Sequence, residues 1–146
     1  MEGVKRLKES IKPGIQRESG SVDAQVAACV SELMNMTTSI HKLHLKITGT
    51  GSYAAHKALN ELYDALPGHA DALAEGYQGA AEKLLTYKDS APRVLNSVSE
   101  AIDYMRDMCD MICALQEKVP YSEIVNTLDT FKDSLNSAKY KLLFLK

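Results

Sequence analysis

The four histidines of the chain lie within one short stretch, and carboxylates follow them at helical spacing. His56 and Asn60 are four residues apart, and Asp71 and Glu75 are four apart in the same way. Side chains at this spacing lie one above the other on one face of an α-helix. Imidazole and carboxylate ligands together suit Fe(II), with Zn(II) or Mn(II) as alternatives. We therefore treat these residues as a candidate metal site, with His44 supplying a second imidazole.

A single copy of the chain cannot bring the two pairs to one ion. On a helix with 100° per residue, Asn60, Asp71 and Glu75 lie about 40°, 60° and 100° around the axis from His56, so they share one flank. Along the axis, however, His56 and Asp71 are about 22 Å apart. Two copies paired antiparallel about a twofold axis would place the imidazole and amide of one copy opposite the carboxylates of the other. This pairing creates two equivalent sites between the copies.

The elements that must position these residues are predicted to be helices. Apolar residues recur at alternating steps of four and three, which is the signature of one buried helical face. The pattern predicts helices over 21–47, 52–77 and 93–117, and a fourth after Pro120. Four such helices with one apolar face each predict an all-α four-helix bundle over residues 21–146.

Some local features refine this prediction. Ser21 or Asp23 is the expected N-terminal cap of the first helix. Pro67 should bend the second helix without ending it, because the apolar pattern stays in phase across it. Residues 80–88 have room for a further short helix. Cys109 and Cys113 fit buried core positions of the third helix.

Composition excludes several classes of protein. The chain has 146 residues, 45% of them hydrophobic and 25% charged, which is typical of one globular domain and not of a disordered chain. Three cysteines without a C-x-x-C pair argue against a disulfide framework or zinc ribbon, and favour a cytoplasmic setting. No apolar run is long enough to span a membrane. No Glu-x-x-His is present, which argues against a di-iron site inside one bundle.

Charge is unevenly distributed along the chain. The total of 17 Lys and Arg against 19 Asp and Glu is nearly balanced, but residues 1–20 carry more basic than acidic groups. We expect residues 1–20 to form a flexible, mildly basic N-terminal arm. Its simplest role is that of a solvated tail, and weak DNA binding is the alternative.

The residues around the histidines resemble the Dps family, the DNA-protecting, starvation-induced miniferritins of the ferritin-like superfamily. The family pattern is a histidine, a glycine five residues later and a histidine twelve later, then an aspartate and a glutamate fifteen and nineteen beyond that. The residues that fit this pattern are His44, Gly49, His56, Asp71 and Glu75. The detailed match covers about residues 41–76, and the fourth helix is similar more loosely.

The resemblance implies a specific function. Family members bind Fe(II) between two subunits, oxidise it preferentially with hydrogen peroxide and store ferric mineral in a twelve-subunit shell, and many also bind DNA. Their fold is a ferritin-like bundle with a long crossover between helices 2 and 3. For this chain the resemblance implies an iron-binding protein, a candidate ferroxidase, that forms an antiparallel homodimer or a larger shell up to a dodecamer. The implied metal ligands are His44, His56, Asn60, Asp71 and Glu75.

The chain also departs from the family pattern. Asn60 stands where the family usually has a metal-binding carboxylate, Leu45 replaces a tryptophan next to His44, and Gly76 replaces an arginine. An amide oxygen is a neutral and weaker ligand than a carboxylate. The alternative hypothesis is therefore a non-enzymatic helical assembly or structural protein that kept the ferritin-like fold with a degraded metal site.

Overall fold

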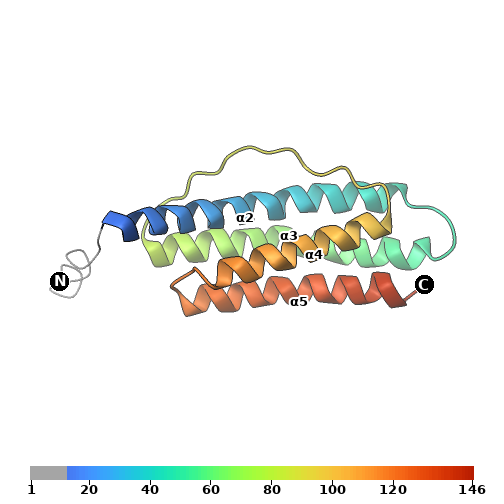
Figure 1. The fold of residues 1–146 in the computed structure, drawn as a ribbon. Coiled ribbons are helices and arrows are strands. Elements are labelled where there is room, and N and C mark those ends of the chain that lie inside the picture. Colours follow the sequence, from blue (N-terminus) through green and yellow to red (C-terminus); the bar gives the residue numbers. More distant parts are fainter. Residues whose placement is uncertain (1–12) are drawn as a thin grey trace.

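The computed structural model describes residues 13–146, with side chains from Val22 onward, and contains four helices in this range (Figure 1). The helices are α2 (Pro13–Lys46), α3 (Ser52–Ala81), α4 (Val98–Gln116) and α5 (Ser122–Phe144). No residue between 13 and 146 belongs to a strand. The predicted all-α class is confirmed. Each of the helices in this range corresponds to one apolar pattern in the sequence.

The first helix begins earlier than the sequence pattern predicted. Helix α2 starts at Pro13, and proline is tolerated there because the first N–H groups of a helix have no helical partner. Residues 13–20, expected within the arm, therefore belong to α2. The expected caps Ser21 and Asp23 lie inside the helix. The remaining part of the expected arm, residues 1–12, lies outside the described residues, as does any contact it makes with DNA.

Helices α3 and α4 run in the same direction, and both are antiparallel to α5 (Figure 1). Contacts along the helices show this arrangement, because they join the start of one helix to the end of the other. The contacts pair Gly51 with Lys146, Gly76 with Ile124, Cys109 with Lys139 and Gln116 with Val125. The chain must therefore return along the whole bundle between the end of α3 and the start of α4.

This return is made by residues 82–97, which follow α2 from one end to the other (Figure 1). Four side-chain contacts mark the route: an ion pair between Lys83 and Asp23, and hydrogen bonds from Asn35 Nδ2 to Ser90 Oγ (2.7 Å), from Ser39 Oγ to the Arg93 carbonyl (2.7 Å) and from Lys46 Nζ to Asn96 Oδ1 (3.2 Å). None of residues 84–96 is helical, so the further short helix for which residues 80–88 had room does not form. A helix would advance only about 1.5 Å per residue against about 3.3 Å for extended chain, too little to span the bundle.

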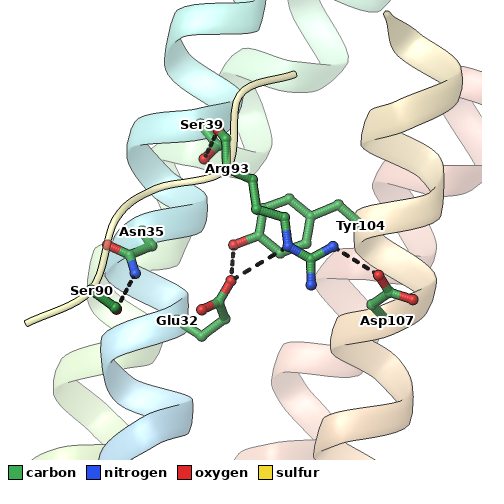
Figure 2. A network of polar contacts seen from close by, with 7 residues as sticks. All are labelled: Glu32, Asn35, Ser39, Ser90, Arg93, Tyr104 and Asp107. Carbon is green, nitrogen blue, oxygen red and sulfur yellow. Dashed lines mark hydrogen bonds and ion pairs between the residues drawn. The ribbon is translucent and has the colours of Figure 1, made fainter. Parts of the chain in front are cut away.

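Arg93 holds the later part of this connection between two helices (Figure 2). Its Nη1 atom donates to Asp107 Oδ2 on α4 at 2.7 Å, and its Nε atom lies 3.9 Å from Glu32 Oε1 on α2. The guanidinium also lies over the Tyr104 ring, 4.1 Å from the centroid. The Tyr104 hydroxyl donates to Glu32. Burial and this carboxylate raise the pKa of Tyr104, so the phenol keeps its proton as a hydrogen-bond donor.

Helix α4 begins at Val98 and not at the predicted residue 93. Ser97 caps it, because the Ser97 hydroxyl accepts the Glu100 N–H at 3.1 Å. The Glu100 carboxylate in turn accepts the Asn96 N–H at 2.6 Å. The reciprocal bonds resemble a capping box and set the start of the helix. Val94 would be the first apolar residue of the predicted helix 93–117, but it lies on the connection instead and is 78% exposed.

The core lies along the contact faces of all four helices. Its fully buried side chains come mainly from the predicted apolar stripes: Leu33, Ile40, Leu59, Leu66, Leu73, Met105, Ile112, Leu128, Phe131 and Leu135. The two cysteines predicted in the core differ from this expectation, since Cys109 is half-buried and Cys113 is exposed. None of the described helices has the length and apolar character that crossing a membrane requires.

Candidate metal centre

Two glycines shape the turn that brings the first two candidate ligands together. Gly49 and Gly51 have φ angles of +96° and +80°, a left-handed conformation that costs glycine little. The turn returns the chain so that His44, near the end of α2, meets His56, near the start of α3. Their rings stack with centroids 3.6 Å apart and planes 19° apart. His44 is buried, with only 6% of its surface exposed.

The two imidazoles hold each other through backbone carbonyls. His44 Nδ1 lies 2.8 Å from the His56 carbonyl oxygen, and His56 Nδ1 lies 3.0 Å from the His44 carbonyl oxygen. A carbonyl oxygen only accepts hydrogen bonds, so each Nδ1 atom must carry the proton. In the neutral rings the lone pair is therefore on Nε2, the atom that can bind a metal ion. A histidine ligand in a metal site commonly donates its other N–H to a carbonyl in this way.

Tyr63 and His41 complete a cluster around His44. The Tyr63 hydroxyl lies 3.3 Å from His44 Nε2 and donates to Asn60 Oδ1 at 3.0 Å. The exposed His41 ring stacks on the Tyr63 ring, with centroids 4.0 Å apart. Sequence reasoning did not assign a role to either residue. The available signal was their spacing, because His41 precedes His44 by three residues and Tyr63 follows Asn60 by three.

Asn60 is held by hydrogen bonds on both sides of its amide. Its Nδ2 atom donates to Asp64 Oδ2 at 2.7 Å, while its Oδ1 atom accepts from Tyr63. The acceptor-only carboxylate of Asp64 fixes the amide orientation, because it must face the NH₂ group. The Asn60 oxygen points toward the tyrosine beside His44 and can bind a metal ion only by giving up this bond.

Asp71 and Glu75 lie farther along the same helix. Both side chains are exposed, and among the described residues neither has a hydrogen-bond or ion-pair partner. Every residue from Ser52 to Ala81 is α-helical, so Pro67 does not divide α3 into two helices. The rise of this continuous helix separates Asp71 from His56 by about 22 Å.

The predicted ligands therefore form two separate groups within one chain. His44, His56 and Asn60 lie together, while Asp71 and Glu75 form the second group. Within residues 22–146, where side chains are described, no three His, Cys, Asp or Glu side chains come together in a way that could hold a metal ion. A complete mixed site requires a second copy of the chain.

The fourth histidine faces a different part of the molecule. His69 Nε2 lies 2.7 Å from Ser134 Oγ on α5, and its ring packs against Phe131 with centroids 4.7 Å apart. Burial lowers the pKa of His69, which favours the neutral imidazole. His69 therefore serves the α3–α5 packing and is not near the other three histidines.

Comparison with protein families places the chain in a family whose function is unknown. The family of unknown function DUF5856 matches residues 44–142, well over half of the chain, so the chain belongs to this family. The matched segment includes all five candidate ligands, from His44 to Glu75. No curated protein and no solved structure matches the chain.

Proposed function

We propose that the protein binds Fe(II), as substrate, at two equivalent sites between two antiparallel copies of the chain, in the manner of a divergent Dps-like miniferritin. In each site His44 and His56 come from one copy, and Asp71 and Glu75 come from the other. Asn60 lies at the edge of the site. Because an isologous pair repeats every contact, both sites have the same composition.

The observation that carries this proposal is the reciprocal bonding of His44 and His56. Each ring donates its Nδ1–H to a backbone carbonyl, which leaves both Nε2 atoms as lone-pair donors in a fixed orientation. Such preorganisation lowers the cost of binding a metal ion. The unpartnered carboxylates of Asp71 and Glu75 supply the negative charge that the histidine group lacks.

The ferritin-like assignment has separate support from the path of the chain. Residues 82–97 run the length of α2 and make α3 parallel to α4, which is the connection that a ferritin-like bundle needs between its second and third helices. A bundle with only short loops would instead make consecutive helices antiparallel. The contacts of Arg93 with Glu32 and Asp107 hold this connection in place.

Iron oxidation is the second part of the proposal. Two Fe(II) ions give one electron each to hydrogen peroxide, which takes up two protons and leaves as two water molecules. The carboxylates of Asp71 and Glu75 stabilise the additional charge of Fe(III). The neutral Asn60 amide does not add to this effect, so we expect tight binding of one iron per site and slow turnover.

Anaerobic titration with Fe(II) tests the binding step. Two equivalent sites in a pair of chains amount to one site per chain, so wild-type protein should bind about one Fe(II) per chain, and Glu75→Ala should bind none at the same concentrations. Asp133→Ala is the matched control, because Asp133 is also an exposed helical carboxylate. If Glu75→Ala and wild type bind Fe(II) equally, the proposal is wrong and the non-enzymatic helical assembly is the better description.

A further inference from the structure

A second group of metal-binding side chains lies on the face between α4 and α5. Cys109 and Cys113 are one helical turn apart on α4, and each thiol faces a lysine of α5. Lys139 Nζ lies 3.8 Å from Cys109 Sγ, and Lys132 Nζ lies 3.9 Å from Cys113 Sγ. Both distances are those of N–H···S hydrogen bonds. The antiparallel packing of the two helices therefore makes two thiol–ammonium pairs side by side.

The spacing of the thiols fits a cation that takes two ligands. Side chains one turn apart have Cβ atoms about 5–6 Å apart. Two metal–sulfur bonds of about 2.3 Å in a line place the sulfur atoms about 4.6 Å apart, which this spacing allows. No third His, Cys, Asp or Glu joins them into a larger ligand group in the part of the chain with described side chains. A tetrahedral zinc site would need such additional ligands.

The charges around the thiols select between cations. Two thiolates and a monovalent cation carry a net charge of −1, and the ammonium groups of Lys132 and Lys139 compensate this charge. A divalent cation with two thiolates is neutral and gains nothing from the lysines. Asp129 accepts from Gln116 at 2.8 Å and pairs with Lys132 at 3.2 Å, so its carboxylate is already occupied. Soft thiolate ligands also prefer soft cations such as Cu(I).

The two cysteines differ in exposure in a way that suits metal entry. Cys113 is exposed, while Cys109 is half-buried. Burial raises the pKa of Cys109, and the neighbouring Lys139 ammonium acts in the opposite direction. Cys29, in contrast, is fully buried, and burial raises its pKa to about 12. It belongs to the core and has no path to a cation in solvent.

We propose that Cys109 and Cys113 form a two-coordinate site for a soft monovalent cation of the Cu(I) type, with Lys132 and Lys139 balancing the charge of the bound dithiolate. Binding joins the cation to both sulfur atoms and releases two protons to solvent. This site lies on a different pair of helices from the proposed iron site and does not depend on it.

Competition with a coloured Cu(I) chelator tests the site in the full-length, reduced protein under anaerobic conditions. Wild type should bind one Cu(I) per chain. Cys113→Ser should weaken binding by at least roughly a hundredfold, the upper end of what loss of an outer partner costs a metal site. Cys109→Ser should do the same, and Cys29→Ala should bind as wild type does. Circular dichroism spectra would verify that each variant keeps its helices.

The lysines give an independent measurement at the same site. Lys132→Gln combined with Lys139→Gln should weaken Cu(I) binding by about tenfold and leave the stoichiometry unchanged. Zn(II) should bind no better in wild type than in Cys113→Ser. Three results would overturn the proposal: unchanged Cu(I) affinity in Cys113→Ser, half a Cu(I) per chain, or unchanged affinity in the lysine variant.

Discussion

The two halves of the proposed iron site differ in how firmly one copy of the chain holds their ligands in place. The histidine half is built within one copy: His44 and His56 hold each other, and Tyr63 and Asn60 lie against them. The carboxylate half is not held in this way, because Asp71 and Glu75 are exposed and have no hydrogen-bond or ion-pair partner among the described residues. The difference indicates that the fold prepares the neutral ligands and leaves the charged ones for a partner. Two unpaired carboxylates cost little in water, whereas a buried imidazole such as that of His44 needs hydrogen-bond partners.

The largest expected effect is a loss of iron binding that is equal for both halves. His56→Ala and Glu75→Ala should each weaken Fe(II) binding by at least roughly a hundredfold, because each removes a direct ligand of the same ion. Anaerobic titration measures both. A strong effect of one substitution without the other would show that only one half binds iron.

The free energy of unfolding should distinguish the two halves, although the loss of iron binding should not. His44→Ala removes a buried ring and its hydrogen bond, so the free energy of unfolding should fall by about 1–3 kcal/mol. Asp71→Asn changes an exposed, unpartnered side chain and should stay within about 0.5 kcal/mol of wild type. Urea denaturation without metal measures both values. Equal losses of stability would contradict the view that the fold holds the histidine half in place and leaves the carboxylate half without partners.

Asn60→Asp should lower the stability of the metal-free protein and strengthen its binding of Fe(II). The new carboxylate loses the hydrogen bond to Asp64 and repels it, so the metal-free protein should lose about 1 kcal/mol of stability. A charged oxygen ligand should also strengthen Fe(II) binding by about tenfold. Thermal unfolding with and without Fe(II) compares the two effects. A variant that is destabilised in both conditions would mean that residue 60 does not reach the ion.

Substitution of His69 should have the smallest effect, and only on the way stability depends on pH. Because burial lowers its folded-state pKa below the usual 6.5, His69 contributes stability that is fully present above pH 6.5. This contribution is lost as the pH falls through the folded-state pKa. His69→Gln should flatten that part of the curve and leave Fe(II) binding unchanged. Urea denaturation at several pH values is the measurement, and an unchanged slope in the variant would contradict it.

The sequence predicted the helices better than the connections between them. Stripes such as Leu59, Leu66 and Leu73 identify a buried helical face because burial follows the helical period. The long connection was not predictable in this way. Its path depends on contacts between distant residues, such as Ser39 with the Arg93 carbonyl, and local propensity does not encode them. The same reason explains Val94, which has the spacing of a core residue but precedes the Ser97 cap.

The candidate metal site was also only partly predictable from the sequence. The sequence contains the identities and spacing of the ligands, but it does not show which ring nitrogen of each imidazole carries the proton. Their Nδ1 hydrogen bonds reach carbonyls twelve residues away, and they exist only because Gly49 and Gly51 allow a tight turn.

Gly76 is another residue whose role depends on packing that the sequence alone does not show. A Cβ atom there would lie 3.1 Å from Ile124 Cδ1, so the packing of α5 leaves little room for a larger residue.

The central claim is that each iron site takes ligands from two copies, and mixing two inactive variants tests it most directly. His56→Ala and Glu75→Ala would be unfolded together, refolded as a mixture and titrated anaerobically with Fe(II). If the sites form between copies, one of the two sites in each mixed pair regains both halves. Random pairing makes about half of the pairs mixed, so about one quarter of the wild-type sites should return. If the mixture binds no more Fe(II) than either variant alone, the ligands do not come from different copies.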